Sequence, residues 1–333
     1  MTDAPPFTVS PKAISMIAEI SALIERYVVR LEQQGGLRLR RANKIKTIQS
    51  SLAIEGNALS RSQVSDMLDG KRVVAPLRDI QEVKNAINAY DLAPTLNPFS
   101  VDDLLKSHGV MMAALVDEAG AFRRGGVGVV SGKRVVHLAP SADRVPTLVA
   151  GLLNWVKSAE DHWLIRSCVF HYEFEFIHPF SDGNGRMGRL WQSLLLAKYH
   201  PAFATLPVES MVHDDQQGYY EAINASNVKA DSGPFIDFML HALLKSLKQH
   251  LRFQIGGVSG GVSGGVKGGQ NDVWAFIRKN PGVRANAVAL ALGIPLRTVQ
   301  RHLGRLKRES RILFRGAPRN GGYFAQSGCQ RNN

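Results

Sequence analysis

Cysteine is scarce in this sequence of 333 residues, and long apolar runs are missing from it. Two cysteines, Cys168 and Cys329, are too few for a disulfide framework and too far apart for a zinc ribbon, so we expect a reducing, cytoplasmic setting. The lack of a stretch of about 18 apolar residues argues against a membrane-spanning helix. The start, MTDAPPFTVS, has no basic segment followed by an apolar core, and we expect no secretory signal.

Positive charge gathers at the C-terminal end of the chain. Residues 271–333 contain 12 Lys and Arg against two Asp and Glu, a net charge of +10, whereas the whole chain carries +13. This asymmetry indicates a polyanion partner for the C-terminal segment, with a solvated basic surface as the alternative.

A Gly-rich repeat precedes this basic segment. Ile255 to Gln270 reads IGGVSGGVSGGVKGGQ, which offers no face for packing. Such a composition predicts a flexible tether. It would separate a domain of about 250 residues from one of about 60.

The part before the tether is expected to be mainly α-helical. Apolar residues recur there at helical spacing. The expected helices cover residues 11–34, 42–54, 60–69, 78–91, 101–116, 143–157, 160–176, 185–199, 215–228 and 234–253. The exception is 126–137, where two valine-rich runs flank Ser131-Gly132-Lys133 and predict a β-hairpin. It must pack on the helices, because a lone hairpin is not stable in water.

Residues 178–189 combine features that suit phosphate chemistry, and they read HPFSDGNGRMGR. Asp182 supplies hard oxygens of the kind that Mg²⁺ prefers. Gly183 and Gly185 flank Asn184, which allows successive backbone N–H groups to point to one place. A helical pattern resumes at Gly185, so the loop and a helix N-terminus together form a natural phosphate cradle.

Two arginines and a histidine complete this segment. Arg186 and Arg189 share a face of the expected helix, where they can neutralise phosphate charge. His178 lies at the other end of the loop, close enough in principle to take a proton from an incoming hydroxyl. A nucleotide–magnesium site beside a histidine base describes phosphoryl or nucleotidyl transfer. A lone GNG or a lone histidine is commonly structural, whereas nine specified residues at fixed spacing are far more informative.

The segment resembles the Fic family pattern HPFx(D/E)GNGRxxR, and it matches every specified position. The resemblance extends over about residues 10–253, and GAFR at 120–123 with the valine-rich hairpin looks like the family's approach to its target-positioning flap. Most Fic proteins are adenylyltransferases with a helical core and a β-hairpin flap. The resemblance therefore implies transfer of AMP from ATP to a Tyr, Ser or Thr hydroxyl of a protein, with the chain itself as one target.

The resemblance also implies roles for the ionisable residues of the motif. His178 would be the general base for the target hydroxyl. Asp182 would hold Mg²⁺ against the α- and β-phosphates of ATP. Arg186 would bind the terminal phosphates, and Arg189 would bind the γ-phosphate.

The remaining motif positions would shape the loop and the nucleotide site. The backbone of Gly183, Asn184 and Gly185 would form an anion hole. Phe180 would pack inward, and Ser181 falls at the variable position of the pattern and would be dispensable.

A later segment resembles the family's adenine-side region. It contains Tyr219-Tyr220 and Asn227, and by the resemblance Tyr220 and Asn227 would contact the base. The alternative is that Tyr219 and Tyr220 are core aromatics.

An earlier segment, residues 51–57, reads SLAIEGN. Taken alone it is a helix end, with Gly56 as the stop and Glu55 as a surface acid. Ser51 and Glu55 are four residues apart and share a helix face. The segment resembles the family's autoinhibitory motif (S/T)xxxE(G/N), whose glutamate pairs with the second motif arginine, here Arg189.

This resemblance implies inhibition in cis by competition. If Glu55 occupies Arg189 in a bidentate pair, Arg189 cannot grip the γ-phosphate. ATP would then bind with its α-phosphate misaligned, and a misplacement of about 1 Å can cost about a hundredfold in rate.

The basic segment is expected to form helices at 271–280 and 284–292 and a third helix opening at Pro295. The sequences RILFRG and GGYFA then fit a β-hairpin. The arrangement resembles a winged helix, and ALGIPLRTVQRHL resembles its helix–turn–helix, with a Gly in the turn.

A winged helix here would place its third helix in the major groove of DNA. Arg297, Gln300 and Arg301 would then meet bases or phosphates. Arg315 and Arg319, on the hairpin, would add phosphate contacts. The alternative is a protein-contact or target-docking role, since winged helices also serve those purposes.

We therefore expect a mainly α-helical chain in four parts: a helical region carrying the inhibitory motif at 1–100, a Fic core at 101–253, a linker at 254–270, and a winged helix-turn-helix domain at 271–333. Transfer of another nucleotidyl or phosphoryl group is one alternative activity, although both glycines and both arginines of the motif are intact, which favours AMP. A DNA-binding regulator whose Fic domain senses nucleotide is the alternative from a different class.

Overall fold

The computed structural model describes residues 4–33, 36–131, 134–252, 270–292, 295–315 and 322–326. The chain divides into two compact units, residues 1–258 and 259–333. The predicted linker at 254–270 lies outside the described residues, apart from Gln270.

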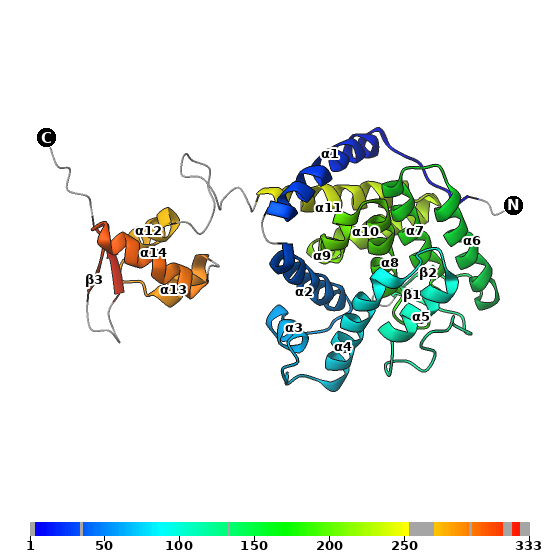
Figure 1. Cartoon of the computed structure of the whole chain (residues 1–333), viewed down its shortest axis with the longest axis horizontal. Helices are drawn as coiled ribbons and strands as arrows, with labels where there is room; N and C mark the ends of the chain where they lie inside the picture. The colour runs from blue at the N-terminus through cyan, green and yellow to red at the C-terminus, as the bar shows by residue number, and fades with distance from the viewer. Residues whose placement is uncertain are drawn as a thin grey trace. The chain divides into compact units, whose positions relative to one another are not determined.

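In its described residues the first unit contains eleven α-helices, three short 3₁₀ helices and one β-hairpin (Figure 1). The α-helices are α1 (Pro11–Gln33), α2 (Gly36–Ile54), α3 (Arg61–Leu68), α4 (Leu77–Leu92), α5 (Val101–Met111), α6 (Val145–Ser158), α7 (Trp163–Ile177), α8 (Asn184–Tyr199), α9 (Val208–Asp214), α10 (Gln216–Lys229) and α11 (Gly233–Arg252). The 3₁₀ helices are η1 (Ala93–Thr95), η2 (Ala142–Arg144) and η3 (Pro201–Thr205). Among the described helices of the whole chain, none is both long and apolar enough to cross a membrane.

The mainly helical character expected from periodicity is confirmed, with three local differences. Helix α9 was not predicted, because seven residues are too few to reveal a helical period. Helix α2 begins at Gly36 rather than near Ala42, since the arginine-rich sequence GLRLRR shows no clear apolar stripe. Helix α5 ends at Met111 rather than at 116, and Ala114 just beyond it has a left-handed φ of 59°.

The first unit has two clusters of buried apolar side chains, and α7 and α8 belong to both. One cluster joins α1 to α11 and includes Phe203 and Phe235. These two helices lie side by side although they come from opposite ends of the unit (Figure 1). The other cluster includes Phe174 and Trp191, and the Trp191 indole donates a 2.9 Å hydrogen bond to the Pro98 carbonyl. The turn between α7 and α8 is therefore held from two sides, since each fully buried aromatic side chain stabilises the fold by about 1.5–3 kcal/mol.

The valine-rich segment forms the expected antiparallel hairpin. Strand β1 (Gly128–Ser131) pairs with β2 (Arg134–Leu138), with Gly128 opposite Leu138 and Ser131 opposite Arg134. The register shifts between Val129 and Val130. The expected turn residues Gly132 and Lys133 lie outside the described part of the chain.

The second unit contains α12 (Gln270–Lys279), α13 (Ala285–Leu292), α14 (Leu296–Arg308) and the antiparallel strands β3 (Ile312–Arg315) and β4 (Gly322–Ala325). An isolated bridge joins Val283 to Tyr323. Val299, Leu303 and Leu306 of α14 are buried in the small core of this unit, as their spacing predicts. Gly293, Arg319 and Cys329, which the sequence singles out, lie outside the described residues.

Candidate active site

The segment 178–189 forms the turn between α7 and α8. His178 ends α7 in the left-handed region, with φ 50° and ψ 62°, and Gly183 precedes α8 with φ 84°. A Cβ at Gly183 would lie 2.7 Å from Sδ of Met112, so both the backbone angle and the space require glycine. The first N–H groups of α8 have no acceptors within the helix, and they present a positive helix end at the turn.

Asn184 and Phe180 close the turn upon itself. The Asn184 side chain accepts a 2.9 Å hydrogen bond from the Phe180 N–H and donates a 2.8 Å bond to its carbonyl. The Phe180 ring is fully buried, as the resemblance implies, and it stacks on His108 with 3.7 Å between ring centroids. The Asn184 side chain is thus committed to the shape of the loop, and its backbone is the part that faces a ligand in the anion-hole assignment.

His108 on α5 holds the turn from the other side, and nothing in the sequence singles it out. Its Nδ1 accepts a 3.0 Å hydrogen bond from the Gly120 N–H, so its Nε2 carries the proton and donates to the Asp182 carbonyl at 3.0 Å. Burial lowers the pKa of His108 to about 4. A neutral imidazole therefore links three segments of the chain.

Arg123 is a second support that sequence reasoning missed. It is 3% exposed and donates to the carbonyls of His178 and Gly125, each at 2.7 Å, and to those of Pro140 and Ile177. These acceptors lie on the approaches to the hairpin and at the end of α7. Arg123 thereby ties the hairpin to the residue predicted as the base.

His178 has a tautomer suited to that role. Its Nδ1 lies 3.3 Å from the Glu175 carbonyl, which can only accept a hydrogen bond. In the neutral ring Nδ1 therefore carries the proton, and Nε2 keeps the lone pair that a general base needs.

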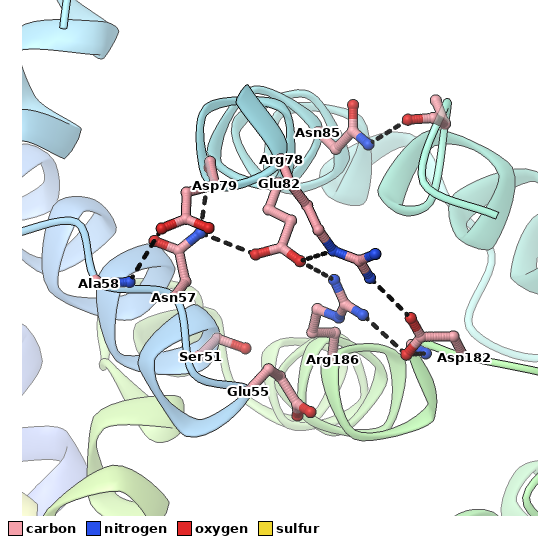
Figure 2. A network of polar contacts seen from close by, with 12 residues as sticks. Ser51, Glu55, Asn57, Ala58, Arg78, Asp79, Glu82, Asn85, Asp182 and Arg186 are labelled. Atoms are coloured by element: carbon pink, nitrogen blue, oxygen red, sulfur yellow. Dashed lines mark hydrogen bonds and ion pairs between the residues drawn. The ribbon is translucent and has the colours of Figure 1, made fainter. Parts of the chain in front are cut away.

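Asp182 and Arg186 form a charged pair at the start of α8 (Figure 2). Asp182 Oδ1 accepts hydrogen bonds from the Gly183 N–H at 2.6 Å and from Arg186 Nη2 at 3.0 Å. Arg186 is 3% exposed, and among the described residues its Nε and Nη1 have no hydrogen-bond partner. Buried donors without partners are costly, and their presence fits a group that accepts hydrogen bonds, such as a phosphate.

The donor set of the turn also fits a magnesium ion bound together with phosphates. The Asp182 side chain is 40% exposed, and its Oδ2 lies 3.6 Å from Arg78 Nη2, beyond hydrogen-bond distance. Mg²⁺ is usually held by one or two carboxylates together with waters and substrate phosphates. The described residues contain no cluster of three or more His, Cys, Asp or Glu that could hold a metal.

Another charged pair joins Arg189 to Glu55, just past the end of α2, with Ser51 of α2 beside it. Arg189 Nη2 donates to Glu55 Oε1 at 2.7 Å and to the Ser51 carbonyl at 3.0 Å, and its Nε donates to Ser51 Oγ at 3.2 Å. The contact with Glu55 uses one carboxylate oxygen, so it is not the bidentate pair expected from the sequence, and Ser51 accepts from Nη2 and Nε of the same guanidinium. A Cβ at Gly185 would lie 2.6 Å from Glu55 Oε1, so this glycine leaves room for the pair.

The electrostatics of Arg189 depend on that carboxylate. The Arg189 side chain is 2% exposed and that of Glu55 is 33% exposed. Burial disfavours the charged guanidinium, but the charge and hydrogen bond of Glu55, together with Tyr219 and the charge of Glu175, raise the pKa of Arg189 above its ordinary value.

Tyr220 and Asn227, the expected adenine-side residues, lie on α10. Tyr220 is 51% exposed, and Gln216 Nε2 donates both to its hydroxyl at 3.5 Å and to the Ile54 carbonyl, beside Glu55, at 3.3 Å. The Asn227 side chain accepts a 2.8 Å hydrogen bond from Tyr172 of α7. Tyr219 is a buried core aromatic, whereas contact of Tyr220 and Asn227 with the base stays a prediction.

The supports that the sequence missed share one property. Arg123 and His108 donate to backbone carbonyls distant in the chain, and Glu82, a buried carboxylate of α4, lies 3.7 Å from Nη1 of Arg186 on α8. One signal was readable: Arg123 ends the GAFR segment quoted above, although nothing local indicates what it binds.

We expect Arg123→Lys to destabilise the first unit. A lysine ammonium cannot reach the carbonyls that the guanidinium fork spans, and each buried carbonyl left unpaired costs about 1–3 kcal/mol. Urea unfolding followed by far-ultraviolet circular dichroism should show that the free energy of unfolding falls by about 2 kcal/mol or more. The exposed neighbour Arg124 provides the control, since Arg124→Lys should change stability by less than about 0.5 kcal/mol. Equal effects of the two substitutions would contradict the role of Arg123.

The Fic/DOC family model matches residues 98–196 of this chain. The crystal structure of a Fic family protein from Desulfovibrio desulfuricans is similar to it with a TM-score of 0.73 and 40% identity, covering 98% of this chain and 100% of that one. The protein adenylyltransferase Fic of Culex quinquefasciatus is 31% identical over 230 residues, which are 64% of this chain and 43% of the relative. The protein of the same name from Nematostella vectensis is 27% identical over 232 residues, 65% of this chain and 52% of the relative. The chain thus spans about half the length of these curated relatives.

The family model covers the whole turn between α7 and α8, where the motif residues meet. The similarity to the D. desulfuricans protein extends over nearly the full length of both chains. This chain is therefore a member of the Fic family.

Proposed function

We propose that this chain is a protein adenylyltransferase that moves AMP from ATP to a hydroxyl of a protein and is inhibited in cis by Glu55. The observation that carries the proposal is the turn between α7 and α8, which brings His178, a helix N-terminus and two buried arginines to one place. The curated relatives that match the chain are named protein adenylyltransferases, which supports the same activity.

The chemistry assigned to this turn is an in-line displacement at the α-phosphorus. The target hydroxyl oxygen forms a bond to the α-phosphorus, and the bond from that phosphorus to the oxygen bridging the β-phosphate breaks. Nε2 of His178 takes the hydroxyl proton, and pyrophosphate leaves. His178 is suited to this task because the Glu175 carbonyl fixes its tautomer.

The phosphates of ATP are assigned to the start of α8. The N–H groups of Gly183, Asn184 and Gly185 would bind phosphate oxygens at the positive helix end. Arg186 and Arg189 would neutralise the terminal phosphates. Mg²⁺, held by Asp182, would supply further charge neutralisation when bound.

Inhibition follows from competition for one guanidinium. Arg189 is buried, and Glu55 and Ser51 occupy donors that a γ-phosphate would need. An ATP that cannot use Arg189 would shift along the site, and its α-phosphate would lose alignment with the attacking oxygen. Glu55 therefore changes the orientation of bound ATP more than it reduces the binding of ATP.

Glu55→Gly should raise AMP transfer by about ten- to a hundredfold, because Arg189 becomes available to the γ-phosphate. The measurement is transfer of label from α-labelled ATP to the chain itself or to proteins of a cell lysate. Mass spectrometry of the product separates an AMP adduct from a phosphate or UMP adduct.

Asp69→Gly is the matched control for this variant. Asp69 also follows a helix end and pairs with an arginine, Arg41 at 2.6 Å, away from the turn. Its loss should leave transfer unchanged, and an unchanged rate in Glu55→Gly itself would remove the inhibitory role.

In the Glu55→Gly background, His178→Ala should abolish transfer while ATP still binds, because the base is lost and the phosphate cradle is kept. Transfer and ATP affinity are measured on the same preparation. His241→Ala, at an exposed histidine of α11, should leave both unchanged. Retained transfer in His178→Ala would show that another group is the base. ATP binding without any transfer in Glu55→Gly would favour the nucleotide-sensing alternative.

A second candidate function concerns residues 270–326, which we propose form a winged helix that binds duplex DNA. The buried stripe of α14 leaves Arg297, Gln300 and Arg301 exposed, as DNA contact requires. Burial first, and then the charges of Arg301 and Arg305, lower the pKa of His302, which is consistent with a positive potential along this helix.

The full chain should bind a labelled duplex at low ionic strength, with affinity falling steeply as salt rises. Replacing Arg297 and Arg301 together by Gln should weaken binding by about tenfold or more, since each removes a phosphate or base contact. Arg61→Gln, at an exposed arginine of α3, is the control and should have no effect. The absence of salt-sensitive binding would favour the docking role for this domain.

A further inference from the structure

Glu82 on α4 is a buried carboxylate that contacts two other segments of the active-site region, through Asn57 and Arg186, and Arg78 of its own helix. Its residue exposure is 8%, and its Oε2 accepts a 2.8 Å hydrogen bond from Asn57. Its Oε1 lies 3.7 Å from Nη1 of Arg186 and 3.5 Å from Nε of Arg78. Figure 2 shows Glu82 between Asn57 on one side and the two arginines on the other.

The contact with Arg186 is one of charge and not of hydrogen bonding. At 3.7 Å the separation exceeds hydrogen-bond distance, and Arg186 Nη1 has no hydrogen-bond partner among the described residues. In a buried setting the attraction between the two charges is weakly screened. Glu82 can therefore hold the guanidinium in place while its donors stay available to a phosphate.

Asn57 connects Glu82 to the inhibitory segment. It lies two residues after Glu55, across Gly56, whose φ of 92° sets the turn. Its side-chain NH₂ donates to Glu82 and to the Asp79 carbonyl at 3.1 Å, and its side-chain oxygen accepts from the Leu59 N–H. The short segment that pairs with Arg189 through Glu55 thus also contacts the partner of Arg186.

Arg78 closes the ring of charges on the solvent side. It lies between Glu82 and Asp182, at 3.5 Å and 3.6 Å, and its side chain is 63% exposed. The Glu82 carboxylate is therefore shared by Arg78 and Arg186. The attraction to Arg78 limits how closely Glu82 can approach Arg186.

From this arrangement we propose that Glu82 is a positioning residue, which orients Arg186 toward the β- and γ-phosphates of ATP and is itself set by Asn57. The inference rests on the proposed function, because it assumes that the turn after α7 binds a nucleoside triphosphate. Residues 55–57 then act on both motif arginines, on Arg189 directly and on Arg186 through Glu82.

The proposal predicts an effect that depends on the phosphates of the ligand. Without the charge of Glu82, the Arg186 guanidinium moves toward Asp182, its remaining acidic neighbour. The terminal phosphates of ATP then lose one charge-assisted contact. In the Glu55→Gly background, Glu82→Gln should weaken ATP binding by about tenfold and AMP binding by less than about twofold. Glu82→Asp, which keeps the charge, should recover part of the ATP affinity.

Isothermal titration calorimetry with ATP and with AMP, each with Mg²⁺, measures these affinities. Asp91→Asn is the matched control, because Asp91 is another carboxylate of α4 that pairs with a cation, Lys44, and it should alter neither affinity. Asn57→Ala should also weaken the binding of ATP more than that of AMP. Combined with Glu82→Gln, it should cause little further loss of ATP affinity. The Asn57 variant also tests the proposal if Glu82→Gln folds poorly.

Equal weakening of ATP and AMP in these variants would mean that Glu82 only supports the local fold, and unchanged ATP affinity would mean that it does not act on Arg186. Either result overturns the proposal. These outcomes are separate from the proposed activity, which is judged by AMP transfer in Glu55→Gly alone.

Discussion

A buried guanidinium, that of Arg189, is the charge on which the resting site depends. A cation with 2% exposure must have anionic or polar partners, because an unpaired buried charge is very costly. Ser51 and Glu55 meet that need and thereby pack the end of α2 against the start of α8. In the proposed function, the burial that would make Arg189 a strong ligand for phosphate would also make an internal carboxylate a strong competitor for it.

Arg186 and Arg189 each pair with a glutamate, and the two glutamates differ in how firmly the fold holds them. Glu82 lies within α4 and is 8% exposed, so its place is fixed by the helix and by Asn57. Glu55 lies just past the end of α2, beside Gly56, and its side chain is 33% exposed. A carboxylate at a helix end can leave its partner with little loss of packing, whereas one inside a buried helix face cannot. The geometry therefore suits Glu55 to a contact that is released and Glu82 to one that persists.

The turn to which the proposed chemistry is assigned is held in place largely by residues outside it. His108 holds its Asp182 carbonyl, Arg123 holds the His178 carbonyl, and Asn184 closes the loop from within. The left-handed backbone of His178 is maintained by this surrounding set of hydrogen bonds. In the proposed reaction the base must stand within hydrogen-bond reach of the attacking hydroxyl, and these supports would keep His178 in that place.

The sequence by itself determined the parts of this protein whose residues are adjacent in the chain. The motif at 178–189, the helical periods, the valine hairpin and the basic third helix of the second unit were all readable, because local spacing decides them. The segment around Glu55 was readable only through resemblance, since no local rule pairs it with an arginine more than a hundred residues later. The tertiary structure alone decided that Ser51 shares Arg189 with Glu55, that Arg123 and His108 brace the turn, and that Glu82 faces Arg186. These contacts join segments distant in sequence. They depend on how the helices pack around α8, and no local pattern of residues determines that packing.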